Sequence, residues 1–494
     1  MSREVYIPEF VDLDSLEFNG KKLSQKEKDK AAFLLSLITI NTLHLQKKEK
    51  MTFFFGPYAD SRTYQGMVHE YKSYLELLEK ENIIIVGKSY LEGEFAKSVL
   101  ITDKPEYRPL LIKPYILSDI PIIKKLYKRK KDVNTPVIEK YPFLARCFNN
   151  NFDINLNGAN KWLEKNKKTD EQYNVHLRAV RQIHNRDYYF KTDRYGRLYT
   201  PVCNLKRELR RFLSYNGLGL VSIDISNSQP FLLGLLMNPE YYKKENADKS
   251  FFNYWNLDPE IIKPLEPIRI EEKSSTLGTI EQSNLIRVET NDEYGIEEYM
   301  ERRNKRKNRE RLRPRGRERD RLSIYMLEEY PHLKDNEDVN LFKKLTQLGN
   351  LYEYLIEQFN AIEPKKLYSR DEMKKKMLLI LFSKDGDEWY DKIIKPKFKK
   401  IFPTVYKVIK QLKRTDYKNI SHLLTNVESK LIIDTICKEF AKKHYRTPIF
   451  TIHDSIATTE PNIDMLKEFF TSKCKEILGV VPQIKIEKWQ DITD

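Results

Sequence analysis

Two aspartates lie at the ends of short apolar runs that predict β-strands. Asp224 ends the run LGLVSID, and Asp454 lies between two apolar runs in TPIFTIHDSIATTE, which predicts a hairpin with polar residues at its tip. A carboxylate in an apolar strand is costly to desolvate unless it is paired or bound to metal. On one sheet, two such carboxylates could hold two divalent ions about 4 Å apart, which suits in-line nucleotidyl transfer. The alternative is that both aspartates only cap turns.

A predicted helix carries the second group of candidate residues. Arg370, Lys374 and Phe382 follow the spacing R-x3-K-x7-F. They lie close to one helical face, because twelve residues make about 3.3 turns. Two cations and an aromatic ring on one face can grip a triphosphate and stack against a base. A routine basic amphipathic helix is the alternative, and the adjacent Lys375 and Lys376 show how easily one arises.

In this order, the three segments resemble motifs A, B and C of family A DNA polymerases and of the related phage-type single-subunit RNA polymerases. IDISNSQP resembles motif A, with Asp224 as its aspartate. The helix resembles the motif B pattern R-x3-K-x7-Y, with Phe382 in place of Tyr and Ser383 in place of Gly. TIHDS resembles motif C in the HDS form typical of the RNA polymerases, where DNA polymerases have HDE.

Two further segments strengthen the resemblance. DRYGRLYTPVCNL, residues 193–205, is similar to an element of both families in which Arg197 would contact the template–primer backbone or minor groove. HLLTNVESKLII is similar to a palm helix of both families, with Glu428 at an often acidic or amide position. The resemblance implies that Glu428 contacts the template or primer and that His453 lies near the primer terminus. The resemblance covers roughly residues 190–240 and 340–494, about half the chain. Five motifs in the correct order are a specific signal, although each alone is weak.

The resemblance implies an α+β right-hand polymerase with an antiparallel palm sheet, helical fingers and a helical N-terminal, thumb-like region. It also implies that Asp224, the backbone carbonyl of Ile225, and Asp454 bind two Mg²⁺ ions. Arg370 and Lys374 would hold the incoming triphosphate, with Lys374 placed to donate a proton to pyrophosphate. The expected partners are a nucleic acid template and primer and nucleoside triphosphates, without a membrane.

The expected domains follow shifts in composition along the chain. They are a mostly helical N-terminal and thumb-like region (1–190), the first palm segment (191–259), a charged insertion (260–338), the fingers (339–419) and the second palm segment (420–494). Within the insertion, residues 302–321 hold twelve Lys or Arg against three acids. This segment is interpreted either as a solvated arm or as a clamp on phosphate backbones.

Different residues favour different sugars, deoxyribose or ribose, in the incoming nucleotide. In the family, the residue five after the motif A aspartate can act as a steric gate against a 2′-hydroxyl, and here it is the bulky Gln229. Phe382 lacks the hydroxyl with which RNA polymerases sense ribose. Both features favour dNTPs, whereas the HDS form and DRYGRLY favour NTPs. We therefore expect a DNA polymerase. The alternatives are a single-subunit RNA polymerase or primase-like enzyme, and an inactive nucleic-acid-binding protein on the same fold.

Composition agrees with a polyanionic partner. The net charge is +16, and surplus Lys and Arg bind nucleic acid through counterion release. The four cysteines show no CxxC spacing, and the N-terminus lacks the apolar core of a signal peptide. We therefore expect a cytoplasmic protein at a nucleoid or at a phage or plasmid replication site.

Overall fold

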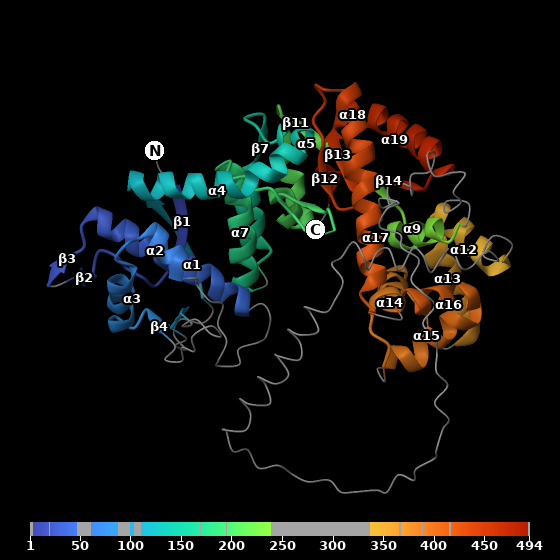
Figure 1. The fold of residues 1–494 in the computed structure, drawn as a ribbon, viewed down its shortest axis with the longest axis horizontal. Helices are drawn as coiled ribbons and strands as arrows, with labels where there is room; N and C mark the ends of the chain where they lie inside the picture. Colours follow the sequence, from blue (N-terminus) through green and yellow to red (C-terminus); the bar gives the residue numbers. More distant parts are fainter. Residues whose placement is uncertain are drawn as a thin grey trace, which may run out of the picture. The chain divides into compact units, whose positions relative to one another are not determined.

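The computed structural model contains helices and antiparallel strands in two compact units (Figure 1). It describes residues 3–18, 20–46, 61–86, 99–102, 110–167, 169–193, 195–238, 336–364, 367–386, 389–413 and 416–492. The first unit comprises residues 1–225, 429–470 and 484–494, and the second comprises residues 226–428 and 471–483. Nearly all of the predicted charged insertion, 260–338, falls outside the described residues.

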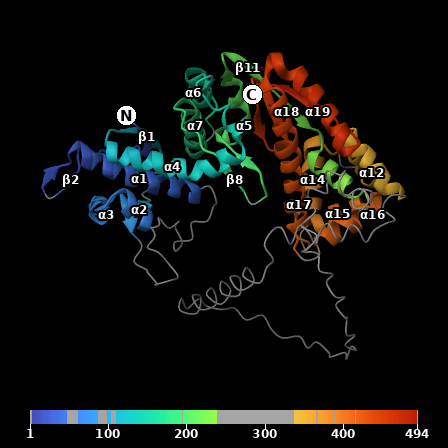
Figure 2. The same cartoon turned by 45° about the horizontal axis from the view of Figure 1, so that its top comes forward.

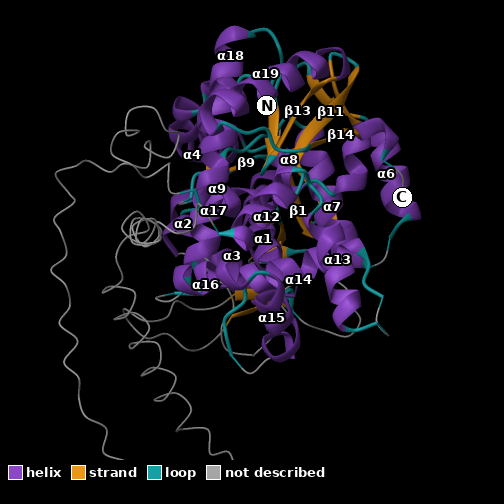
Figure 3. Cartoon of the chain, turned by 90° about the vertical axis from the view of Figure 1, so that its right-hand side faces the viewer, coloured by secondary structure: helices purple, strands orange, loops and turns teal. Residues whose placement is uncertain are grey.

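The main sheet of the first unit is assembled around one long strand. Strand β11 (Leu218–Ile225) pairs antiparallel with β10 (Leu213–Tyr215), β13 (Ser455–Thr459) and β14 (Ile484–Lys488). The sheet is completed by β12 (Phe450–Ile452) beside β13 and by β7 (Phe152–Ile154) beside β10. Figure 3 shows β11, β13 and β14 side by side. Because β11 has neighbours on both edges, its residues 220–223 are all buried, as the apolar run LGLVSI predicts.

The N-terminal region, expected to be mostly helical, contains antiparallel strands as well as helices. Helices α1 (Gln25–Gln46), α2 (Ser61–Met67) and α3 (Tyr71–Lys80) are present. They accompany three antiparallel pairs: β1 (Arg3–Pro8) with β6 (Ile112–Leu117), β2 (Glu17–Phe18) with β3 (Lys21–Lys22), and β4 (Ile84–Val86) with β5 (Val99–Ile101). The longer of these strands are short runs rich in Ile and Val. Such runs gain stability by pairing with distant segments, so helical periodicity does not reveal them.

A chain of helices connects this N-terminal core to the main sheet. It consists of α4 (Ile120–Lys140), α5 (Pro142–Ala145), α6 (Leu156–Lys165) and α7 (Asp170–His184). The segment FKTDRYGRLYTP contains a short hairpin of β8 (Lys191–Thr192) and β9 (Leu198–Tyr199). Helix α8 (Pro201–Asn204) and a 3₁₀ turn (Arg207–Phe212) lead from the hairpin to β10. Figure 2 shows α4 leading toward β8.

The second unit is helical. Its helices are α9 (Ser228–Leu236), α12 (Glu337–Gln347), α13 (Leu351–Ile362), α14 (Arg370–Phe382), α15 (Trp389–Ile401), α16 (Pro403–Leu412) and α17 (Asn419–Ser429). Four fully buried phenylalanines, Phe342, Phe359, Phe398 and Phe402, form part of its core. The helical periodicity seen from Val339 onward is confirmed by these elements.

The segment predicted as one helix before motif C is interrupted. After α17, residues Lys430–Cys437 form a π-helical segment, and α18 (Lys438–Lys443) resumes the α-helix. Such wide helical turns are rare in proteins, and those that occur often lie at functional sites. The last α-helix among the described residues is α19 (Ile463–Leu478). Among the described residues, no helix is both long and apolar enough to cross a bilayer.

Candidate active site

The two strand aspartates lie at the same end of the main sheet. Asp224 is directly opposite Ser455 in the antiparallel pairing of β11 with β13. Ile452 pairs with Ser455 across the β12–β13 hairpin, so His453 and Asp454 form its two-residue turn. Asp454 is therefore the neighbour of the residue that faces Asp224, and both aspartates are half-buried. Directly opposed residues lie about 5 Å apart between Cα atoms, so the fold brings these two carboxylates into one neighbourhood.

His453 occupies an unusual backbone conformation beside this pair. Its φ of +56° lies in the left-handed region, which residues other than Gly adopt infrequently. Burial lowers the pKa of His453, and the positive charge of Arg197 lowers it further, against the opposing effect of Asp454. The imidazole is thus neutral at pH 7 and has one donor and one acceptor nitrogen. Its Nδ1 is buried and has no hydrogen-bond partner in the described part of the chain.

The β8–β9 hairpin is organised by Asp193 and carries Arg197. The Asp193 carboxylate accepts hydrogen bonds from the backbone N–H groups of Tyr195 at 2.9 Å and Arg197 at 3.1 Å. Gly196 has a φ of +87°, and a Cβ there would lie 3.5 Å from the Cβ of Ser429. The edge of the Tyr199 ring meets His453, with 5.9 Å between ring centroids. The turn therefore places Arg197 and His453 in the same part of the first unit.

Arg210 is a residue that sequence reasoning missed. Burial lowers the pKa of its guanidinium, while the negative charges of Glu487 and Asp224 raise it. The same cation contributes to lowering the pKa of His453. Nothing in RELRRF distinguishes Arg210 from Arg207 or Arg211, because the electrostatic surroundings of each arginine are set by the fold.

In the second unit, α9 begins with buried polar side chains. Asn227 precedes the helix with a φ of +55°, and both polar atoms of its amide are buried without a partner among the described residues. Gln229 Nε2 donates a hydrogen bond to Glu428 Oε2. Glu428 is 2% exposed. Glu428 is thus hydrogen-bonded to the predicted gate residue Gln229, and its contact with template or primer stays a prediction.

Helix α14 presents its predicted residues on one side. Ser369 and Glu372 form a reciprocal capping box that fixes the start of the helix. Met373, Met377, Ile380 and Leu381 are buried, whereas Arg370 and Lys374 are exposed and Phe382 is half-buried. Arg370 Nε contacts Glu353 Oε1 on α13 at 2.6 Å, and its guanidinium lies 5.3 Å from the Tyr352 ring centroid. The Arg370–Glu353 ion pair is exposed, and exposed ion pairs contribute little stability. A triphosphate would therefore be able to displace Glu353 from Arg370.

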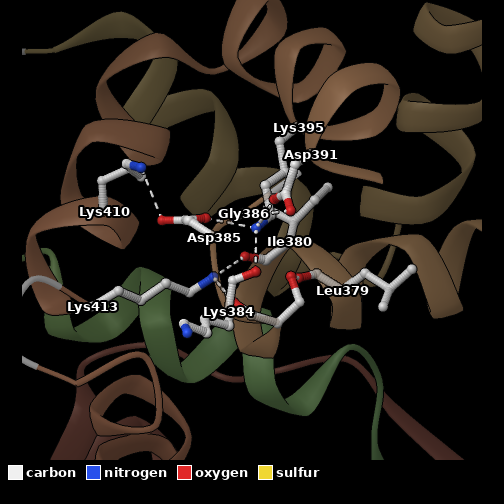
Figure 4. A network of polar contacts seen from close by, with 10 residues as sticks. Leu379, Ile380, Lys384, Asp385, Gly386, Asp391, Lys395, Lys410 and Lys413 are labelled. Carbon is white, nitrogen blue, oxygen red and sulfur yellow. Dashed lines mark hydrogen bonds and ion pairs between the residues drawn. The ribbon is translucent and has the colours of Figure 1, made fainter. Parts of the chain in front are cut away.

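A buried lysine caps the other end of α14 (Figure 4). Lys413 Nζ donates hydrogen bonds to the carbonyl oxygens of Ile380 at 2.6 Å and Ser383 at 3.1 Å. Burial lowers the pKa of Lys413 to about 8. A cation at a helix C-terminus satisfies carbonyls that have no partner within the helix and opposes the negative end of the dipole. Lys413 therefore fixes the turn that follows Phe382.

The same turn is held by an ion-pair network. Lys395 Nζ contacts Asp385 Oδ1 at 2.6 Å and Asp391 Oδ1 at 2.5 Å, and Lys410 Nζ contacts Asp385 Oδ2 at 2.8 Å. Asp391 Oδ2 also accepts a hydrogen bond from the backbone N–H of Gly386 at 3.0 Å. Asp385 thus links α15 and α16 to the turn after α14 (Figure 4). Together with Lys413, these contacts hold the end of α14 in a defined position within the second unit.

The donor atoms near the sheet fit Mg²⁺. Asp224, Asp454 and the carbonyl of Ile225 supply hard oxygen ligands, and Mg²⁺ in phosphoryl-transfer sites is typically bound by one or two carboxylates plus substrate phosphates. Within the described residues, no group of three or more His, Cys, Asp or Glu side chains could hold a metal by itself. The set is therefore suited to a cation shared with a phosphate-bearing substrate.

Comparison with known proteins leaves the family open. No protein-family model matches the chain. No curated protein matches it. Among solved structures, the chain has a weak similarity to the POL domain of Pol1 from M. smegmatis in complex with DNA primer-template and dNTP, at 11% identity and a TM-score of 0.26. The match covers 67% of this chain and 55% of that chain. A similarity this low does not establish a shared fold, so the functional argument depends on the residues themselves.

Proposed function

We propose that the chain is a template-directed nucleotidyltransferase, a DNA polymerase that extends a 3′-hydroxyl with dNTPs. The observation that carries the proposal is the strand register that sets Asp224 opposite Ser455, the neighbour of Asp454. Two carboxylates at the joined ends of two antiparallel strands, with a backbone carbonyl beside them, form an oxygen-rich site for divalent cations. The sequence motifs that resemble motifs A and C converge there, although 230 residues separate the two aspartates in the chain.

In the proposed reaction, the primer 3′-oxygen attacks the α-phosphorus of a dNTP and pyrophosphate leaves. Asp224, the Ile225 carbonyl and Asp454 would hold two Mg²⁺ ions, which would favour ionisation of the 3′-hydroxyl and stabilise the charge on the phosphates. Arg210, which interacts electrostatically with Asp224, would add positive charge to the site. His453, neutral because its pKa is lowered, would offer a hydrogen bond near the primer terminus.

The remaining roles belong to exposed cations. Arg370 and Lys374 are proposed to bind the triphosphate, since both are exposed on α14 and a phosphate would form stronger, charge-assisted hydrogen bonds than water does. Lys374 would donate a proton to the departing pyrophosphate. Phe382, half-buried at the last turn of α14, would pack beside the nascent base pair. Arg197 would contact the template–primer backbone.

A ribonucleotide product is the second candidate, and it has support of its own. The HDS form of the hairpin and the segment DRYGRLY are similar to the RNA polymerases. The bulk of Gln229 and the missing hydroxyl of Phe382 favour deoxyribonucleotides instead. A third possibility, an inactive nucleic-acid-binding protein, is disfavoured because both aspartates, Arg370 and Lys374 are all present.

A primer-extension assay with dNTPs and NTPs in parallel tests the proposal. We expect incorporation by the wild type, and a loss of at least about 10²-fold in Asp224→Asn and in Asp454→Asn, the scale set by removing one preorganised electrostatic contact. Template binding should change little. Asp153→Asn is the matched control, because Asp153 is an exposed aspartate on β7 of the same sheet. Full activity in either site variant would refute the assignment of the metal ligands.

A further inference from the structure

One face of helix α4 is basic and exposed. Lys124, Lys128 and Lys131 follow the spacing i, i+4 and i+7, which places them on one stripe, and all three are exposed. Tyr127 lies on the same stripe and is 40% exposed. Lys125 and Arg129 flank it and are also exposed. The face therefore combines several cations with an aromatic ring over about two helical turns.

Other residues of α4 anchor the helix to the segment before the Arg197 hairpin. The buried Asn134 side chain donates to the Tyr188 carbonyl at 3.2 Å and accepts from the Phe190 N–H at 3.0 Å. Lys130 and Arg3 both contact the carboxylate of Asp187, Arg3 at 2.6 Å. Residues 187–190 run directly into β8. Helix α4, which carries the stripe, is thus attached to the stretch of chain that leads into β8 of the Arg197 hairpin, and Figure 2 shows α4 running toward β8.

The dimensions of the stripe match a phosphate backbone. Seven residues at 1.5 Å rise cover about 10 Å. A duplex carries one phosphate per about 3.4 Å of axis on each strand, so about three phosphates of one strand fit along this length. A tyrosine among lysines adds an amphipathic contact that suits a sugar–phosphate surface, since Tyr hydroxyls are frequent donors to phosphate oxygens.

We propose that the Lys124–Lys128–Lys131 stripe of α4 binds the sugar–phosphate backbone of the nucleic acid duplex that the Arg197 hairpin engages. The inference rests on the proposed nucleic-acid substrate but not on catalysis. Through this contact, the N-terminal part of the chain would bind and position the duplex independently of its base sequence. An anionic lipid surface is the competing partner for a basic helix, and charge alone does not separate the two.

The experiment measures duplex binding against salt concentration without nucleoside triphosphates. The test variant is Lys124→Gln/Lys128→Gln/Lys131→Gln. The matched control is Lys72→Gln/Lys80→Gln/Lys467→Gln, which removes three exposed lysines from α3 and α19. Each lost phosphate contact should reduce the slope of log K against log salt by about 0.9 on duplex DNA. We expect the test variant to lose about two to three units of slope and the control variant to keep the wild-type value.

Equal slopes in the test and control variants would overturn the inference. A second arm measures binding to phosphatidylserine vesicles. Loss of vesicle binding in the test variant, with its duplex slope unchanged, would overturn the inference in favour of lipid. Primer extension by the wild type is run separately, so that an inactive wild type with an α4-dependent slope would refute the polymerase proposal and leave the inference standing. Matching thermal unfolding midpoints would show that the exposed substitutions preserve the fold.

Discussion

At the scale of single residues, the environment of Gln229 decides what its side chain can do. A steric gate must be rigid, because a free glutamine side chain can rotate away from a crowding hydroxyl and has rotamer entropy worth up to ~2 kcal/mol. The hydrogen bond to Glu428 removes that freedom, and the burial of the carboxylate makes the bond stronger than one in water. The pair therefore favours a fixed gate, and it also gives Gln229 a structural role.

These two roles predict different outcomes for Gln229→Gly. As a gate, Gln229 should exclude a 2′-hydroxyl, so the variant should raise NTP incorporation relative to dNTP by about 10²-fold, equivalent to about 2.7 kcal/mol. Glu428→Ala should act in the same direction but less strongly, since it only frees the gate. The measurement is single-nucleotide kcat/KM with both sugars, with Ser228→Ala as control. A parallel fall for dNTPs and NTPs would show that Gln229 only supports the fold, and a wild type that prefers NTPs would make this an RNA polymerase.

Some residue-scale features were accessible from the sequence and others were not. It was possible to predict Asp224 and Asp454 because a charged residue in an apolar run is a local pattern. The same holds for Arg370, because a fixed spacing along a helix is also a local pattern. The Gln229–Glu428 bond joins residues 199 positions apart, and no local pattern encodes it. Arg210 could not be singled out for the same reason, because its electrostatic interaction with Asp224 arises only in the folded chain.

At the scale of elements, local periodicity and distant pairing contribute differently. The β12–β13 hairpin and α14 were predictable, since a two-residue turn between apolar runs and a capping box are both short-range signals. The N-terminal strands were missed because β1 pairs with β6 across more than a hundred residues. The π-helical segment at Lys430–Cys437 was also missed, since a widened turn changes the helical register without changing the apolar composition.

The end of α14 supports a prediction of pH-dependent stability. Lys413 has a pKa lowered from 10.5 to about 8, chiefly by burial, with Lys395 and Lys410 opposing its charge and Asp385 and Asp391 favouring it. Between these two values the unfolded chain binds a proton that the folded protein releases. The free energy of unfolding should therefore rise with pH in this window, relative to a Lys413→Met variant.

At about 1.36 kcal/mol per pKa unit, the free energy of unfolding of the wild type should rise by about 2 kcal/mol relative to that of Lys413→Met between pH 7 and 9.5. Urea denaturation of the wild type and of Lys413→Met across that range measures it. Lys400→Met, an exposed lysine on α15, provides the control and should show no such divergence. Parallel curves for the wild type and Lys413→Met would mean that the lysine keeps an ordinary pKa.

At the scale of the whole molecule, positive charge is distributed unevenly along the chain. Residues 302–321 hold twelve basic residues against three acidic ones, so they carry nine of the sixteen net positive charges. These residues lie outside the described part of the structure. Net charge of this sign raises affinity for polyanions and the rate of association with them without specifying a sequence. The segment and the α4 stripe are therefore expected to contribute separately to nucleic-acid affinity.

Deleting residues 300–322 tests this expectation for the full chain. If the segment contacts phosphates, the deletion should weaken duplex binding and reduce the slope of log K against log salt by about 0.9 for each lost contact. Catalytic turnover at saturating duplex should persist, since both aspartates and α14 lie elsewhere in the chain. Replacing the segment with a Gly/Ser linker of the same length is the control for chain connectivity and should behave like the deletion. An unchanged slope would identify the segment as a solvated arm, because nine net charges that release no counterions make no contact with the phosphates.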